Sequence, residues 1–144
     1  MRIPSSIVTT LGVLSLAVLW VSCSHLDLTP PGSAERVLVG TVSTRSGGDL
    51  PPNAEVTVRV LDLSSGSGRA DVLGEQTITD ARTMPVPFRI EYRAEDALLM
   101  RNVTVEARIS VDGRLSYLTK TSHPLTLANV NDPHRIEVEP AVKH

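Results

Sequence analysis

Cysteine and aromatic residues are scarce in this 144-residue sequence, which has one cysteine and only 3% Phe, Trp and Tyr. A single cysteine cannot form an intramolecular disulfide. So few aromatic side chains leave little material for the stacking platforms that bind nucleic-acid bases or sugars. The formal net charge of −2 also lacks the basic excess that is typical of nucleic-acid-binding proteins. We therefore expect no nucleic-acid partner.

One apolar run, residues 7–23 (IVTTLGVLSLAVLWVSC), stands out near the start of the sequence. Arg2 is the only charged residue before Asp27. The apolar core of the run, residues 7–21, is shorter than the about 20 residues that a membrane-spanning helix needs. A basic start, a short apolar core and small residues at its end are typical of a secretory signal peptide.

The run ends at Cys23, the only cysteine, and residues 21–23 (VSC) resemble the cleavage site of bacterial lipoproteins. Trp20 stands where that class usually has leucine, and Leu19 lies one place early. We expect residues 1–22 to be removed and Cys23 to carry a diacylglyceryl thioether. Two or more acyl chains anchor a protein stably, because each buried CH₂ contributes about 0.8 kcal/mol. Ser24 follows the cysteine, and the absence of aspartate there resembles lipoproteins sorted to the outer membrane.

Three other interpretations of this segment remain open. It can be an uncleaved anchor, an ordinary signal peptide cut elsewhere, or a helix buried in the core. The last is disfavoured because no stripe of polar residues would give such a helix a solvated face.

The residues from Cys23 onward divide into a linker, one domain and a short tail. Residues 23–36 lack periodicity and contain two adjacent prolines, so they predict an extended linker. Residues 37–140 form one predicted domain, and residues 141–144 a short tail. Within the domain, alternation of apolar and polar residues predicts β-strands. The predicted strands cover residues 36–43, 54–64, 71–79, 86–93, 103–111, 114–121 and 134–140, with a short strand at 125–127 and a helical turn at 94–100.

These strands are separated by turn signals such as Asp112-Gly113, whose residues tolerate the positive φ of a two-residue hairpin turn. About seven short, alternating strands predict an all-β fold, an antiparallel two-sheet β-sandwich with immunoglobulin-like or transthyretin-like architecture. The only tryptophan lies in the signal segment, so the buried Trp between two cysteines of true immunoglobulin domains is absent.

Several short motifs together resemble the YbaY lipoprotein family, which shares a domain with YscW, the secretin-piloting lipoprotein of type III secretion systems. The motifs are GTV at 40–42, LPPNA at 50–54, VTVRVLDL at 56–63, GEQ at 74–76, VPF at 86–88, EARI at 106–109 and GRL at 113–115. The resemblance covers roughly residues 37–138. It implies a β-sandwich held by a lipid at the outer membrane and facing the periplasm. Most members of the family have no established activity, and piloting belongs to a minority.

The sequence offers no recognisable catalytic machinery. The four histidines have no metal-binding spacing, and neither a nucleophile elbow nor a phosphate-binding loop is present. We expect no metal, no cofactor and no enzymatic activity. An alternative function is an envelope enzyme or a binding module for cell-wall glycans, in which Glu91 and Glu106 would supply the carboxylate pair.

The preferred function is a non-catalytic lipoprotein that binds or chaperones another envelope protein, with a secretin pilot as the sharper version. Prolines cannot donate a backbone hydrogen bond, so the strand that follows Met84 should lie at the edge of a sheet. An exposed edge can accept a partner strand, although the prolines can equally serve to prevent pairing. The predicted partner-binding residues are Pro85, Val86, Pro87, Arg89 and Glu91.

Overall fold

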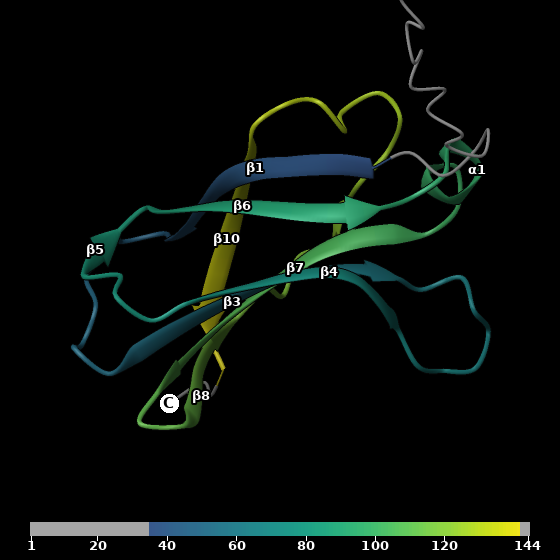
Figure 1. Ribbon diagram of the computed structural model, residues 1–144. Coiled ribbons are helices and arrows are strands. Elements are labelled where there is room, and N and C mark those ends of the chain that lie inside the picture. The colour runs from purple at the N-terminus through teal and green to yellow at the C-terminus, as the bar shows by residue number, and fades with distance from the viewer. Residues whose placement is uncertain (1–34, 142–144) are drawn as a thin grey trace, which may run out of the picture.

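The computed structural model describes residues 35–141, which form ten strands and one short helix (Figure 1). The elements are β1 (Glu35–Thr44), β2 (Gly48–Asp49), β3 (Ala54–Asp62), β4 (Asp71–Ile78), β5 (Thr83–Met84), β6 (Val86–Arg93), α1 (Asp96–Leu99), β7 (Val103–Val111), β8 (Arg114–Leu118), β9 (His123–Pro124) and β10 (His134–Pro140). The predicted signal peptide, Cys23 and most of the linker lie outside the described residues, as does the end of the tail.

The predicted all-β class is confirmed, and seven of the described strands have five residues or more. Alternation identified them because each strand has one buried and one solvated face: β6 alternates strictly, with Phe88, Ile90 and Tyr92 buried. Asp112 and Gly113 have φ of 51° and 74°, as the hairpin turn between β7 and β8 requires. The predicted helical turn is α1.

The short strand predicted at residues 125–127 is wrong by two residues, since β9 is His123–Pro124. The chain turns instead at Thr126, whose backbone N–H donates to Asn129 Oδ1 at 2.8 Å. This side-chain bond replaces a strand partner, as is typical of asparagine in turns.

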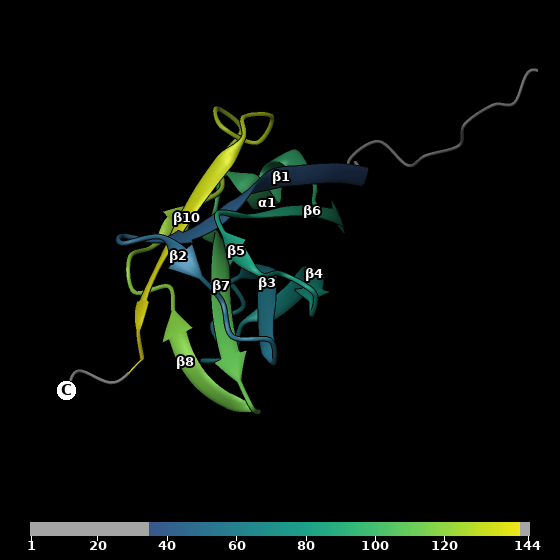
Figure 2. The ribbon, with the colours of Figure 1, turned by 90° about the vertical axis from the view of Figure 1, so that its left-hand side faces the viewer.

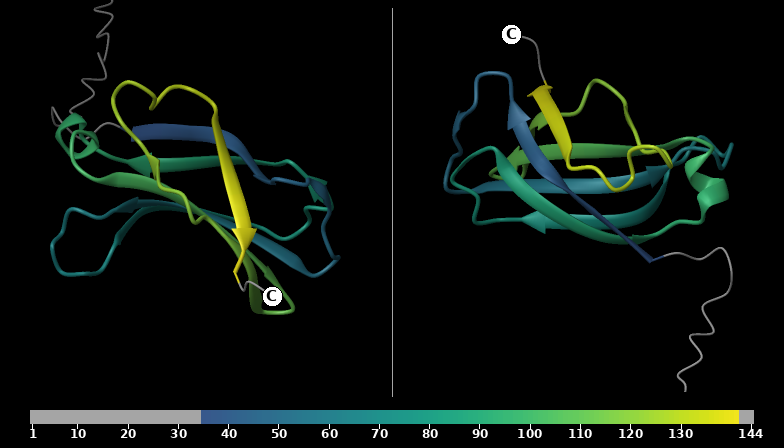
Figure 3. Two further views of the ribbon diagram at one scale, coloured as in Figure 1. Left: turned by 180° about the vertical axis from the view of Figure 1, so that it is seen from behind. Right: turned by 90° about the horizontal axis from the view of Figure 1, so that it is seen from above.

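The two-sheet sandwich is not confirmed, because hydrogen bonds connect the main strands in one continuous order, β4-β3-β7-β8-β10-β1-β6, with β9 beside β7. β1 and β6 lie over β3, β4 and β7, and β10 crosses steeply between these two layers (Figure 1; Figure 3). β10 pairs with β1 in parallel over Gly40–Thr44 and with β8 only at Leu118 and Tyr117. The result is a single sheet curved into an almost closed barrel. The parallel pair also departs from the predicted all-antiparallel arrangement.

The core fills the space between the layers. Its largest fully buried side chains are Leu38, Ile90, Leu99, Ile109, Leu125 and Ile136. They come from β1, β6, α1, β7, the β9–β10 connection and β10, so burial ties every layer together and stabilises the barrel mainly through the hydrophobic effect. Within residues 35–141, no helix has the length and apolar character needed to cross a membrane.

Candidate functional site

The five residues predicted to bind a partner lie on β6 or directly before it. Pro85, Pro87, Arg89 and Glu91 have exposed side chains, whereas Val86 is buried in the core. Four of the five can therefore offer a side chain to a partner. That they do so stays a prediction.

β6 is the last strand of the hydrogen-bonded order, so the predicted edge position of the prolines is confirmed. The backbone N–H of Arg89 points away from β1 and donates to Gln76 Oε1 of β4 at 2.7 Å. Backbone groups two residues apart point to the same side of a strand, so the nitrogen of Pro87 faces the same edge but has no hydrogen to donate. The Gln76 side chain and Pro87 thus occupy the free edge of β6, where the backbone of another strand would otherwise pair.

β4 covers this edge of β6 along a line that we call the seam. Gly74 makes the approach close: a Cβ atom there would lie 2.7 Å from Cβ of Tyr92 and 2.9 Å from the carbonyl oxygen of Glu91. Beside it, the β3–β4 register shifts between Val60 and Leu61. An added strand would have to displace β4, which is one way that proteins protect sheet edges.

The outer face of β1 and β6 mixes apolar and charged side chains. Val37 and Val39 are 40% and 37% exposed, and they stand opposite Glu91 and Arg89 in the strand register. Arg89 Nη2 lies 3.9 Å from Glu91 Oε1, and such exposed ion pairs contribute little stability. This face therefore presents two half-exposed valines next to a pair of oppositely charged side chains.

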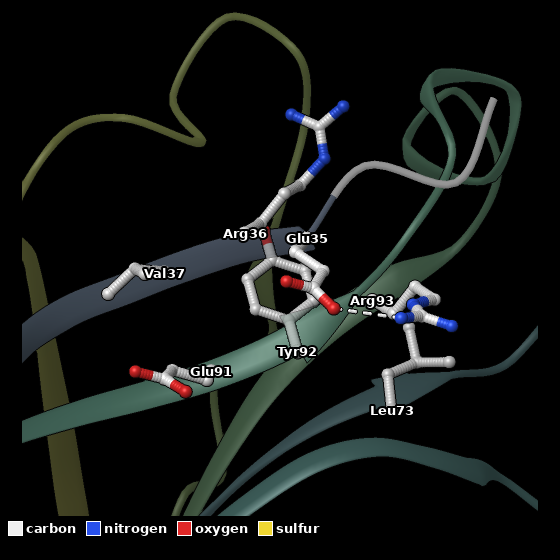
Figure 4. Close-up of a pocket in the computed structure, with 7 residues that line it drawn as sticks. All are labelled: Glu35, Arg36, Val37, Leu73, Glu91, Tyr92 and Arg93. Atoms are coloured by element: carbon white, nitrogen blue, oxygen red, sulfur yellow. Dashed lines mark hydrogen bonds and ion pairs between the residues drawn. The ribbon is translucent and has the colours of Figure 1, made fainter. Parts of the chain in front are cut away.

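A hollow of about 440 Å³ opens beside the seam, close to the start of β1 (Figure 4). It is lined by Glu35, Arg36, Val37, Leu73, Glu91, Tyr92 and Arg93. Arg93 Nη2 lies 2.8 Å from Glu35 Oε1, while Arg36 donates to the carbonyl of Ala94 at 2.9 Å and pairs with Asp96. Because each of these charged groups already has a partner, in the lining or next to it, the hollow offers a free ionic ligand little to bind.

Tyr92 is 4% exposed, and its hydroxyl has no hydrogen-bond partner among the described residues. Burial raises the pKa of Tyr92, against a smaller lowering by the nearby Arg36 guanidinium. A buried hydroxyl without a partner loses its bonds to water and gains nothing in return.

Replacing Tyr92 with phenylalanine should therefore raise the free energy of unfolding by about 1 kcal/mol, because the ring stays and the unsatisfied hydroxyl goes. Urea denaturation of both proteins measures the change. Tyr117→Phe is the control, because Tyr117 is half-buried and its hydroxyl is not among the buried unpartnered atoms. A loss of stability in Tyr92→Phe would show that the hydroxyl makes a bond that the fold depends on.

A second hollow lies at the opposite end of the barrel from α1, and we call it the apolar groove. Its volume is about 740 Å³, within the range of pockets that hold a drug-sized molecule. Figure 2 looks onto this end, where β2, β5, β8 and the end of β10 come together. The apolar side chains in its wall are Leu50, Met84, Val111, Leu115 and Tyr117.

Leu115 is the most solvent-exposed of these apolar side chains, at 44%, and Asp49 and Arg114 add one charge of each sign to the wall. Sequence reasoning missed this groove, because its wall is assembled from segments far apart in the chain. The available signal was Leu115, an apolar residue in a predicted strand that stays exposed, beside Tyr117, which packs against the core only in part.

The two carboxylates that the sequence suggested for a glycan-cleaving site, Glu91 and Glu106, lie apart in the structure. Glu91 on β6 and Glu106 on β7 both face outward from opposite layers, and Glu106 pairs with Arg108. They do not flank a common site, as a glycosidase pair must. No group of three or more His, Cys, Asp or Glu residues suited to a metal occurs in the described part of the chain.

Comparison with known proteins connects this fold to secretion. Residues 33–138 match the family described as type III secretion system lipoprotein chaperone, YscW. Over 87 residues the chain is 29% identical to the uncharacterized lipoprotein YbaY of Escherichia coli (strain K12), which is 60% of this chain and 46% of that protein. The chain thus spans about half the length of this curated relative.

Among solved structures, the chain is similar to an alternative pilotin from the type II secretion system of Vibrio cholerae. The TM-score is 0.62 at 25% identity, and the match covers 76% of this chain and 100% of the pilotin chain. The family match covers residues 33–138, which include most of the barrel and more than half of the chain. The chain therefore belongs to the YscW family of type III secretion system lipoprotein chaperones.

Proposed function

We propose that this protein is a non-catalytic lipoprotein of the outer membrane whose domain faces the periplasm and escorts a secretion-system subunit, with a secretin as the preferred cargo. The solved relative is named a pilotin, and the family is named for lipoprotein chaperones of secretion. The lipid on Cys23 would hold the domain at its membrane, and the cargo would travel with it.

The observation that carries this proposal is the apolar groove. It is large enough for several apolar side chains of a partner, and Leu115 and Met84 offer it apolar surface that is not fully buried in the free protein. Burying such surface is the main source of affinity in helix-in-groove and strand-in-groove complexes. The charges of Asp49 and Arg114 at the wall would fix the orientation of the bound segment rather than supply affinity.

Replacing Leu115 with glutamate should lower recovery of the cargo at least about tenfold, because a carboxylate would be buried without a partner in the complex. Recovery is measured by crosslinking in cells that make the lipidated full-length protein, followed by identification of the attached protein. Leu127→Glu is a matched control, since Leu127 is 43% exposed and lies outside the groove wall. Equal recovery with both variants would contradict binding in the groove.

A photo-crosslinking residue at position 115, 89 or 127 separates the competing surfaces. A secretion-system subunit attached only from position 115 supports the groove, and attachment only from position 89 moves the site to the β6 residues predicted from the sequence. Attachment of glycan fragments, or of no protein, at both position 115 and position 89 would contradict the proposed function itself.

A further inference from the structure

The connection between β8 and β10, residues 119–133, closes the side of the barrel that the main strands leave open. β8 and β10 pair only at their Leu118/Glu139 and Tyr117/Pro140 positions, and β10 then diverges towards β1. We call residues 119–133 the strap. Figure 1 shows it as the looped segment that leads into β10.

The strap is attached along one edge of β7. Thr119 Oγ1 accepts from the backbone N–H of Ala107 at 2.8 Å, and Leu125 N–H donates to the carbonyl of Val103 at 2.9 Å. Between them, β9 pairs with Thr104 and Val105. Leu125 and Val130 of the strap are 1% and 4% exposed, so its release would uncover both the edge of β7 and part of the core.

His123 is the unsatisfied point in this attachment. Its backbone carbonyl accepts from Thr104 Oγ1 at 3.1 Å, but its ring Nε2 is sealed from solvent with no hydrogen-bond partner in residues 35–141. Opposite it on β7 stands Val105, which is buried and offers no polar group. Burying an unpartnered polar atom is costly, so the strap is held less firmly here than its burial suggests.

The charged groups that act on His123 come from β10. They are His134, which repels a proton on His123, and Glu137, which attracts one. His134 Nε2 lies 3.0 Å from the carbonyl oxygen of Asn129, within the strap itself. On β7, Glu106 is the nearest carboxylate in sequence to Val105, but it points to the other face and pairs with Arg108.

Burial lowers the pKa of His123, His134 lowers it further, and Glu137 opposes them. A histidine whose pKa is lower in the folded protein binds its proton better when released. Its contribution to stability is present above the ordinary pKa of about 6.5 and is lost as the pH falls through the folded-state pKa.

We infer that the strap is an acid-released latch: protonation of His123 detaches β9 from the edge of β7 while the rest of the barrel stays folded. Local opening of this kind can occur because β7 keeps its pairing with β3 and β8 when β9 leaves its edge. The opened state exposes the backbone groups of Thr104 and Val105, which are then free to pair with an extended segment of a partner.

Hydrogen exchange of the full-length protein, measured by mass spectrometry near pH 7.5 and near pH 5, tests the latch in a range where histidine titrates. After correction for intrinsic rates, protection of residues 119–126 should fall severalfold at the lower pH, because the lowered pKa of His123 makes the released strap the better proton acceptor. Protection of β3 should stay unchanged. Unchanged protection of the strap, or an equal loss in β3, would overturn the inference without any variant.

His123→Gln removes the titrating group and keeps a polar side chain of similar reach. The difference in strap protection between the two pH values should then fall below about twofold. His134→Gln is the matched comparison: it removes the neighbouring charge and should leave most of the pH response. A full pH response in His123→Gln would assign the opening to another group.

Discussion

Replacing Gly40 with alanine should lower the free energy of unfolding by about 3 kcal/mol, at the upper end of what overpacking costs. A Cβ atom at this position would lie 2.1 Å from the carbonyl oxygen of His134 and 2.7 Å from Cζ of Phe88. The first contact is with backbone, which cannot rotate away as a side chain can. Gly40 is also the first residue of β1 that pairs with β10, so relief of the overlap would separate the pair that joins the two layers.

Urea denaturation measures this loss, and Gly66→Ala separates its cause from the general cost of removing a glycine. Gly66 has a φ of 64° and open space around its missing Cβ, so alanine there adds only backbone strain of about 1 kcal/mol. Adding Phe88→Leu to Gly40→Ala should recover little, because the contact with the His134 carbonyl remains. A Gly40→Ala protein within 1 kcal/mol of the parent would show that β1 and β10 separate easily.

The strands themselves could be predicted because their signal is local. A half-buried strand alternates its faces residue by residue. The spacing of Phe88, Ile90 and Tyr92 therefore predicts β6 without reference to the rest of the chain. The turn at Asp112 and Gly113 is equally local, since its backbone conformation depends on those two residues.

The arrangement of the strands could not be predicted in the same way. Alternation says which face of β10 is buried, but it does not say that β10 pairs with β1 in parallel and crosses between the layers. Gly40 is required there because its missing Cβ leaves room for the carbonyl oxygen of His134. The two residues are far apart in the sequence, so no local pattern reveals this contact. For the same reason the sequence favoured a sandwich over a barrel that is almost closed.

For the candidate sites too, features that depend on local sequence could be predicted, and features that depend on distant contacts could not. The exposed side chains of Arg89 and Glu91 were predicted correctly from alternation, whereas the cover that β4 places over their strand edge depends on Gly74 and Gln76. His123 reads as an ordinary loop residue in the sequence. The shielded, unpartnered Nε2 of its half-buried side chain becomes visible only once β7 and β10 are in place.

Replacing Cys23 with alanine should have the largest effect on where the protein resides. Cys23 is the only cysteine and lies outside the described residues, so this expectation rests on the signal-like segment that precedes it and on the family. Loss of the thiol removes the site of the diacylglyceryl thioether. The membrane-bound fraction should fall at least about tenfold, since stable attachment needs two or more acyl chains.

Fractionation of cells into membrane and soluble material measures this change, and the mass of the mature wild-type protein identifies its first residue and the lipid that it carries. Ser22→Ala keeps a small residue before the cysteine and should leave attachment unchanged, while Ser24→Asp should retain the protein in the inner membrane if sorting follows the family. A Cys23→Ala protein that stays bound to the membrane with residues 1–22 still attached would show that this segment is an uncleaved anchor. The domain would then be held by a peptide rather than by a lipid, and the escort of cargo to the outer membrane would lose its means of transport.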